Sequence, residues 1–302
     1  MTTATVRVPA KINLCLGVGP VRDDGYHPLA TVYQAVDVHD EVKATATEDD
    51  EISVTVHLEA DESAEVPTDG DNIAVKAAHL LRDTTGTEAG VQLAIRKVIP
   101  VAGGMAGGSA DAAAALVACN EAWGTGLGRP ELERLAAQLG SDVPFLLHGG
   151  NAMGGGRGET VSPVLARGSY YWVAAVAATG LSTKAVYAEF DRLNEGSNVA
   201  QPEVPDDLLA ALRAGDAEAL GRSLSNDLTL AALSLRPELA GTLDIGLEAE
   251  ALGAVISGSG PTCVFLAADE NHSLDIAMAL AGAGVCADVI QARGPVAGAR
   301  LV

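Results

Sequence analysis

Apolar and polar side chains alternate along the first 16 residues, which is typical of a strand with one buried face. Lys11 and Asn13 both fall on the polar face, so their side chains should point the same way, about 6–7 Å apart. Pro9 cannot donate a hydrogen bond to a neighbouring strand, so it indicates a sheet edge or a bulge. The apolar face consists of Val6, Val8, Ala10, Ile12, Leu14 and Leu16.

The rest of the first half is expected to contain strands first and helices after, which predicts an α+β arrangement. Period-two stretches predict strands at 31–38, 41–47, 52–58 and 91–98. The acidic stretch 61–70 has few apolar residues and is expected to be a surface loop. Capping signals predict three helices: from Asp71 as N-cap to Arg82, over 109–123, and from Pro130 in a first turn to just before Gly140.

The second half has a different order, a strand followed by helices, a hairpin, a helix and a strand, which suits a split-βαβ sandwich. The stretch 149–168 is rich in Gly, Ser and Pro, so we place a boundary near residue 165 and expect domains at 1–165 and 166–302. Strands are predicted at 170–177, 253–260, 261–267 and 285–292, and helices at 183–194, 206–213, 216–224, 237–250 and 272–283.

The formal net charge of −21 argues against nucleic acid or an anionic membrane as a partner, because both would be repelled. It leaves room for a small phosphorylated ligand, since charges more than about 8 Å away are largely screened at physiological salt. Such a ligand would need local donors: a lysine, a helix N-terminus or a metal ion.

Cysteine usage and the N-terminal sequence predict a cytoplasmic protein. The stretch MTTATVRVPA lacks a basic segment followed by an apolar run, and no apolar run reaches the roughly 18 residues that a membrane span needs. The cysteines have no metal-ligand spacing and lie in apolar stretches, so we expect reduced core residues. They are Cys15, Cys119, Cys263 and Cys286.

The glycine-rich stretch 100–111 (PVAGGMAGGSAD) carries the strongest chemical signal, because it follows a predicted strand and opens a helix. Its glycines allow close backbone approach, and the helix N-terminus offers free N–H groups to an anion such as a triphosphate. A tight turn without a ligand is the alternative. The chain contains neither the G-x-x-x-x-G-K-[ST] loop nor the G-x-G-x-x-G dinucleotide fingerprint.

Three further segments are ambiguous when each is taken alone. Lys11 in PAKINL (9–14) could be a solvated strand lysine, and Asp142 in LGSDVPF (139–145) could be a helix N-cap. The stretch SGSGPTC (257–263) could be a hairpin turn.

Together these segments resemble the GHMP kinase superfamily, which includes galactokinase, homoserine kinase and mevalonate kinase. PAKINL combined with DDGYH (23–27) is similar to the 4-diphosphocytidyl-2-C-methyl-D-erythritol kinases, as are GDNIAVKAA (70–78) and IPVAGGMAGGSADAAA (99–114). The resemblance implies a two-domain α+β fold. The N-terminal ATP-binding domain would be ribosomal-protein-S5-domain-2-like, and the C-terminal domain would be a ferredoxin-like split βαβ.

The resemblance also implies that ATP phosphorylates the 2-hydroxyl of 4-diphosphocytidyl-2-C-methyl-D-erythritol, in the non-mevalonate route to isoprenoids. Lys11 and Asp142 would be catalytic, with Asp142 either accepting the proton of the substrate hydroxyl or orienting that hydroxyl. Asn72 and Asp111 would lie near the adenosine. Mg²⁺ is the expected cofactor, but its ligands stay open because Ala110 replaces a hydroxyl that many relatives carry. The ATP loop would consist of Pro100, Val101, Ala102, Gly103, Gly104, Met105, Ala106, Gly107, Gly108, Ser109 and Ala110.

The cytidylyl substrate would lie between the two domains. Tyr26 would stack on the cytosine, His27 would bind its edge, and Tyr187 would close the sandwich from the second domain. The full substrate set is Asn13, Tyr26, His27, Thr183, Tyr187, Gly258, Ser259 and Gly260.

Three other functions remain open at this point. Another GHMP kinase, such as homoserine or mevalonate kinase, would share the glycine loop but would not need Tyr26 or His27. A nucleic-acid-binding protein is disfavoured by the charge, and a regulatory pseudo-kinase is disfavoured because Lys11, Ser109 and Asp142 are all present. A monomer and a homodimer are both compatible with the sequence.

Overall fold

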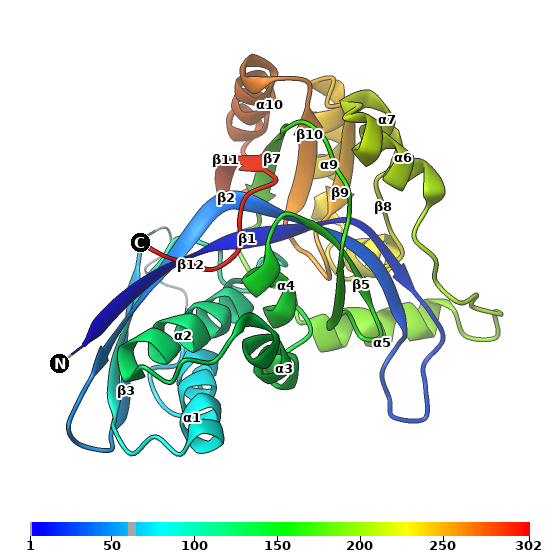
Figure 1. The fold of residues 1–302 in the computed structure, drawn as a ribbon. Helices are drawn as coiled ribbons and strands as arrows, with labels where there is room; N and C mark the ends of the chain where they lie inside the picture. The colour runs from blue at the N-terminus through cyan, green and yellow to red at the C-terminus, as the bar shows by residue number, and fades with distance from the viewer. Residues whose placement is uncertain (1, 60–64) are drawn as a thin grey trace.

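Two β-sheets organise the chain in the computed structural model, which describes residues 2–59 and 65–302 (Figure 1). The larger, eight-stranded sheet has the path β12-β1-β2-β4-β3, while β5 and β8 join it at β2 and β1 and β6 pairs with β5. Its strands are β1 (Thr3–Val18), β2 (Leu29–Ala46), β3 (Ile52–Leu58), β4 (Val91–Lys97), β5 (Asn151–Gly155), β6 (Thr160–Pro163), β8 (Ser225–Asn226) and β12 (Arg300–Leu301).

The second sheet belongs entirely to the second half of the chain and has the order β11-β7-β10-β9. All three of its strand pairs are antiparallel, in agreement with the predicted split-βαβ order. Its strands are β7 (Tyr170–Val176), β9 (Gly253–Ile256), β10 (Cys263–Ala267) and β11 (Asp288–Gly294). The helices of this half are α5 (Thr183–Leu193), α6 (Asp206–Ala214), α7 (Ala217–Ser223), α8 (Thr229–Leu235), α9 (Glu238–Glu248) and α10 (Glu270–Ala283).

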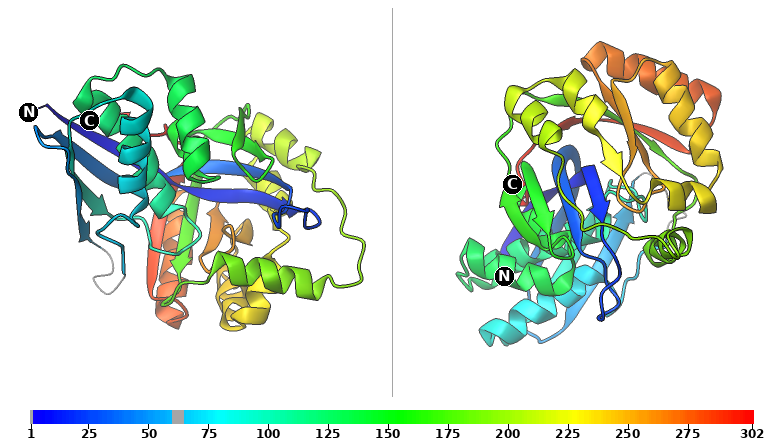
Figure 2. Two further views of the ribbon diagram at one scale, coloured as in Figure 1. Left: turned by 90° about the horizontal axis from the view of Figure 1, so that it is seen from below. Right: turned by 90° about the vertical axis from the view of Figure 1, so that its right-hand side faces the viewer.

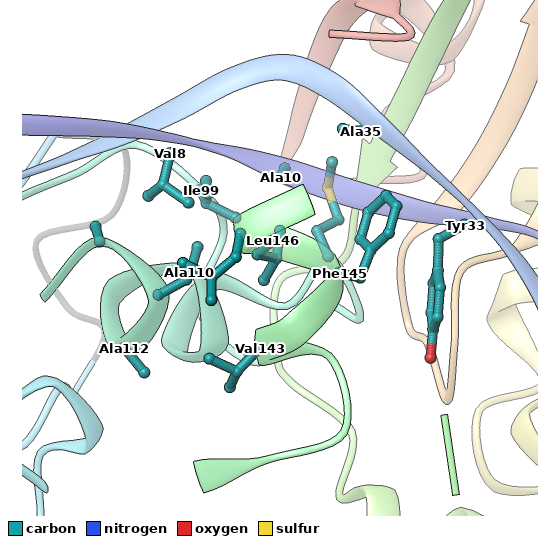
Figure 3. Packing of buried hydrophobic residues seen from close by; sticks show 14 of the residues in the cluster. Val8, Ala10, Tyr33, Ala35, Ile99, Ala110, Ala112, Val143, Phe145 and Leu146 are labelled. Carbon is teal, nitrogen blue, oxygen red and sulfur yellow. The ribbon is translucent and has the colours of Figure 1, made fainter. Parts of the chain in front are cut away.

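Helix α2 packs directly on β1 and β2, because alanines line the helix and let the backbones approach closely. Figure 3 shows Val8 and Ala10 of β1 on the side of the sheet where Ala110 of the helix lies, with Phe145 beside Tyr33. The rings of Phe145 and Tyr33 stack with centroids 4.9 Å apart. The helices of the first half are α1 (Ile73–Thr85), α2 (Gly107–Trp123), α3 (Arg129–Leu139) and α4 (Val143–His148).

The two predicted strands at 31–38 and 41–47 form one long strand, β2. The pairing of β1 with β2 shifts register between Pro9 and Ala10, so the predicted bulge is present at the residue that lacks a backbone N–H donor. The carboxylate of Asp40, inside β2, is fully buried. It accepts hydrogen bonds from the backbone N–H groups of Val98 and Ile99, which offset the cost of burying it.

Several local predictions were wrong. The stretch 149–168 is not simply a connection: β5 and β6 form a hairpin that extends the first sheet. Glycines hide these strands, because they give no alternating side-chain pattern. Helices α4 and α8, which have six and seven residues, were also missed. The N-cap of α1 is Asn72 rather than Asp71, and its side chain accepts from Ala74 N at 2.8 Å.

The predicted loop at 61–70 falls partly outside the described residues, and its described part, 65–70, forms no helix or strand. The division near residue 165 stays a prediction. β6 ends at Pro163 and β7 begins the other sheet at Tyr170, but β8 and β12 return to β1 from the second half (Figure 2). Cys15, Cys119 and Cys263 are buried, Cys286 is half-buried and all four are free. Among residues 2–59 and 65–302, no helix combines the length and apolar character needed to cross a bilayer.

Candidate active site

A cavity of about 1050 Å³ lies where segments from both halves of the chain converge. β1 supplies Lys11 and Asn13, and the loop before β2 supplies Tyr26 and His27. The remaining walls come from the glycine-rich loop, the residues before α4, the β5–β6 turn, α5 and the turn between β9 and β10. The four sequence segments singled out for their chemistry therefore meet in one place.

The Lys11 ammonium lies buried on the cavity wall, so its interpretation as a solvated lysine is wrong. Its Nζ donates to Asn13 Oδ1 at 2.6 Å and to the Gly104 carbonyl at 2.9 Å. Asp142 Oδ2 lies 3.7 Å from the same Nζ. Burial lowers the pKa of Lys11, and the Asp142 carboxylate opposes this effect. Two of the three ammonium protons are thus held by the scaffold, and the third faces Asp142 and the cavity.

Asp142 occupies the position before α4, but its side chain makes no capping hydrogen bond. The carboxylate lines the cavity instead, with 28% of its side chain exposed. The side chain of Tyr33 is buried beside it, and burial and then the Asp142 charge raise the pKa of the Tyr33 hydroxyl. The Asp142 carboxylate is therefore available to a ligand, and the Lys11 ammonium and the buried Tyr33 side chain lie beside it.

The glycine-rich loop presents the first turn of α2 to the cavity. Ala106 precedes the helix with a positive φ of 61°, and Gly107 and Gly108 line the cavity with N–H groups that have no partner within the first turn of the helix. Gly104 also has a positive φ, 77°, and a Cβ at this position would lie 2.2 Å from the Ser257 carbonyl. The loop therefore needs glycine there, and the resulting helix start can receive phosphate oxygens.

Not every residue of the predicted ATP loop reaches the cavity. The lining residues are Ala102, Gly103, Gly104, Ala106, Gly107, Gly108 and Ser109. Met105 and Ala110 are buried in the core, and Pro100 and Val101 are half-buried and do not line the cavity. Their contribution is to shape the loop.

His27 sits at the other end of the cavity with its ring fixed. Its Nδ1 lies 2.8 Å from the Gly19 carbonyl, which can only accept, so Nδ1 carries the proton. Nε2 then faces Asp191 Oδ1 at 3.5 Å. The ring of Tyr187 lies 5.2 Å from that of His27, and Tyr26 is 53% exposed at the rim.

The turn between β9 and β10 joins this end to Lys11. Thr183 Oγ1 and Ser259 Oγ are 2.9 Å apart, so α5 and the turn are in contact. A Cβ at Gly258 would lie 3.2 Å from Lys11 Nζ, and Gly258 has a positive φ of 58°. Gly258, Ser259 and Gly260 all line the cavity, as the substrate prediction requires.

Two further predicted residues, Asn72 and Asp111, also do not line the cavity. Asn72 caps α1 and donates to the Pro67 carbonyl. Asp111 lies in a buried group with Lys97, whose Nζ donates to it at 2.9 Å and also pairs with Asp40. Burial, opposed by the Lys97 ammonium, raises the pKa of Asp111 to about 7. Direct contact of either side chain with adenosine stays a prediction.

Three charged residues of the cavity were not predicted from the sequence: Arg157, Lys184 and Asp191. Arg157, in the β5–β6 turn, places its guanidinium 4.4 Å from the centre of the Tyr26 ring. In the described residues this guanidinium makes no ion pair with a carboxylate. Asp191 follows Thr183 and Tyr187 at spacings of four on α5, so the three share one helix face. That spacing was the available signal for Asp191; no pattern marked Arg157.

Comparison with known proteins agrees with this geometry. The family described as GHMP kinases N terminal domain matches residues 72–150, and GHMP kinases C terminal matches residues 208–285. The 4-diphosphocytidyl-2-C-methyl-D-erythritol kinase of Salinispora tropica is 55% identical over 98% of this chain and 93% of its own. The kinase of the same name from Thermobifida fusca is 52% identical over 100% and 99% of the two chains.

The chain belongs to the 4-diphosphocytidyl-2-C-methyl-D-erythritol kinase family. A crystal structure of a 4-(cytidine 5'-diphospho)-2C-methyl-D-erythritol kinase superposes on this kinase with a TM-score of 0.76. It has 29% identity and covers 95% of this chain and 98% of its own. Homoserine kinase from Cytophaga hutchinsonii reaches 0.75 at 20% identity over 100% and 98%, which shows the shared fold alone. The predicted family, enzyme class and two-domain GHMP fold are confirmed.

Proposed function

We propose that this kinase transfers the γ-phosphoryl group of ATP to the 2-hydroxyl of 4-diphosphocytidyl-2-C-methyl-D-erythritol, in the non-mevalonate route to isoprenoids. One observation carries the proposal: the Lys11–Asp142 pair lies in the same cavity as an anion-binding helix start and an aromatic pocket. ATP and an alcohol substrate that carries a nucleobase can therefore occupy the two ends of this cavity at once. The pair of charges lies between them.

ATP would place its phosphates on the N–H groups at the start of α2. The helix macrodipole favours negative charge at this end, which offsets the protein's overall charge of −21 locally. Among the described residues, no group of three or more His, Cys, Asp or Glu side chains could hold a metal ion. We therefore expect Mg²⁺ to be held mainly by the ATP phosphates, where it shields their charge, with Ser109 as the nearby hydroxyl of the loop.

The acceptor alcohol would lie between Asp142 and Lys11. The Asp142 carboxylate accepts the hydrogen bond from the hydroxyl and takes its proton as the O–P bond to the γ-phosphorus forms. The bond from that phosphorus to the bridging oxygen breaks, and ADP leaves with the electron pair. The remaining Lys11 proton stabilises negative charge on the transferring group.

Cytosine would stack between Tyr26 and Tyr187, with its amino group toward His27 and Asp191. In the neutral imidazole, Nε2 is an acceptor because Nδ1 carries the proton, and Asp191 Oδ1 is an acceptor 3.5 Å away. A cytosine amino group has two N–H donors and can serve both. Uracil presents a carbonyl at the same position, so it would be repelled.

Replacing Asp191 with Asn should therefore weaken discrimination between bases. The amide can donate to a uracil carbonyl, so we expect the ratio of kcat/KM for the cytidylyl over the uridylyl substrate to fall about tenfold. Steady-state kinetics with both substrates measure this ratio. Asp275→Asn, an exposed carboxylate on α10, is the matched control and should leave the ratio unchanged. An unaltered ratio in the Asp191 variant would remove the assignment.

Arg157 is suited to the diphosphate that links cytidine to the erythritol. Its guanidinium stacks on Tyr26, and its N–H donors lack a carboxylate ion pair in the described residues. Arg157→Ala should raise KM for the cytidylyl substrate about tenfold and change kcat less than threefold, because a charge-assisted contact is lost in ground and transition states alike. Arg192→Ala, on the outside of α5, is the control. Equal KM values for the two variants would contradict the role.

The acceptor identity is tested by measuring ADP release with a panel of alcohols. We expect turnover with 4-diphosphocytidyl-2-C-methyl-D-erythritol and at most background rates with homoserine or mevalonate, which have no base for the aromatic pocket. Turnover preferring either rival would mean that this kinase serves a different substrate of the same fold.

A further inference from the structure

Residues 225–227 connect the two halves of the molecule beside the catalytic lysine. β8, made of Ser225 and Asn226, pairs in parallel with β1 at Cys15 and Leu16. Asp227 adds two hydrogen bonds to the same strand: its N–H donates to the Leu16 carbonyl, and its carboxylate accepts from Val18 N. The backbone around Asn226 is thereby fixed to the sheet that carries Lys11.

The side chain of Asn226 contacts the end of β9 and the turn that follows it, which belong to the second half of the chain. Its Nδ2 donates to the carbonyls of Ile256 and Gly258, both at 2.7 Å, and its Oδ1 accepts from Leu228 N at 2.8 Å. One amide group therefore uses one donor on the last residue of β9 and the other on the turn at 257–260 that follows it. Asn226 is half-buried and does not line the cavity.

The turn that Asn226 holds packs against the catalytic centre. Gly258 lies so close to Lys11 that a Cβ there would be 3.2 Å from Nζ. Ser257 Oγ donates to the Gly104 carbonyl at 3.0 Å, and Lys11 Nζ donates to the same carbonyl at 2.9 Å. The turn at 257–260, the glycine-rich loop and Lys11 are therefore connected by hydrogen bonds that meet at the Gly104 carbonyl.

We propose that Asn226 is a positioning residue: it holds the 257–260 turn against Lys11 and the glycine-rich loop, and so fixes the spacing between the ATP phosphates and the acceptor alcohol. Its kinetic consequence rests on the proposed phosphoryl transfer. Such transfer depends on alignment, and a displacement of about 1 Å can cost about 100-fold in rate. Asn226 touches neither ligand, so its removal acts on turnover through the turn.

Asn226→Asp is a nearly isosteric test. The carboxylate can still accept from Leu228 N, but it loses both donors and places an oxygen opposite two carbonyls. We expect kcat to fall about 30-fold, while the dissociation constant for ATP stays within twofold because the start of α2 is intact. Asn226→Ala, which removes the donors without repulsion, should lower kcat about tenfold by the same reasoning. Titrating the fraction of ATP-binding sites excludes unfolding as the cause.

Asn120→Asp is the matched control, because Asn120 also bridges a backbone N–H and a carbonyl, both of Leu127, but far from the cavity. Its kcat should stay within about twofold of wild type. Hydrogen exchange of amides 257–260 in the ligand-free protein should speed up in both Asn226 variants and not in Asn120→Asp, whichever substrate the kinase uses. The proposal is overturned if exchange in the turn is unchanged, or if kcat falls equally in the control. A wild-type protein that is inactive with 4-diphosphocytidyl-2-C-methyl-D-erythritol would instead refute the proposed substrate.

Discussion

Asp142→Asn is expected to lower kcat about 1000-fold, with the dissociation constant for ATP changed less than threefold. The amide keeps the shape of the side chain but cannot accept the proton of the substrate hydroxyl. The structure supports a large effect, because the carboxylate makes no capping hydrogen bond and faces the cavity beside Lys11. Single-turnover kinetics at saturating ATP measure the change in the chemical step.

A true N-cap aspartate gives the control for this variant. Asp216 caps α7, and its Oδ1 accepts from Ala219 N at 2.9 Å. Asp216→Asn keeps a capping oxygen, so its activity should match wild type within about twofold. If Asp142→Asn behaved in the same way and retained more than about a tenth of wild-type turnover, Asp142 would be an ordinary helix-start residue and not the group expected of a catalytic acceptor.

Lys11→Met is expected to lower kcat about 100–1000-fold, which is the range found when one preorganised donor to developing charge is removed. Methionine fills a similar volume, so the core around β1 should remain packed. The variant also leaves the oxygens of Asn13 and Gly104 without their donor, and it removes the cation nearest to Asp142. We therefore expect a fall in melting temperature of several degrees together with the loss of turnover.

Lys43→Met separates the two effects, because Lys43 is an exposed lysine on β2 and corresponds to the solvated alternative for a strand lysine. This control should keep both turnover and melting temperature. The double variant Lys11→Met/Asp142→Asn should be hardly slower than either single variant. Both residues act on the same reacting hydroxyl, so the effects of the two substitutions on kcat should not add in free energy. Effects that multiply in the double variant would argue against a joint role.

The centre of the site could be predicted from the sequence because it depends on patterns between residues that are close together in the chain. Alternation along β1 placed Lys11 and Asn13 side by side, and the structure brings their side chains within hydrogen-bonding distance. The glycine-rich loop was recognisable because a strand, several glycines and a helix start follow one another in the chain. The turn at 257–260 could be placed on the cavity only through the resemblance to a family, because its contact with Lys11 spans most of the sequence.

The residues that were missed depend on contacts that no local pattern encodes. Arg157 reaches Tyr26 because the β5–β6 hairpin pairs with β2, and its glycines conceal the strands. Asn226 sits in a two-residue strand, too short to give a periodic signal. Asp111 was predicted to lie near the adenosine, and this stays a prediction; in the structure its Oδ2 accepts a hydrogen bond from the buried Lys97 ammonium.

We propose that one cavity holds the acceptor hydroxyl between Lys11 and Asp142, facing the terminal phosphate of ATP. A crystal structure with a non-hydrolysable ATP analogue and 4-diphosphocytidyl-2-C-methyl-D-erythritol tests it most directly. The 2-hydroxyl oxygen is expected within about 3 Å of an Asp142 oxygen and about 3–3.5 Å from the γ-phosphorus, with the Lys11 ammonium adjacent. A bound substrate whose 2-hydroxyl lies elsewhere, with another group between Asp142 and the phosphate, would contradict it.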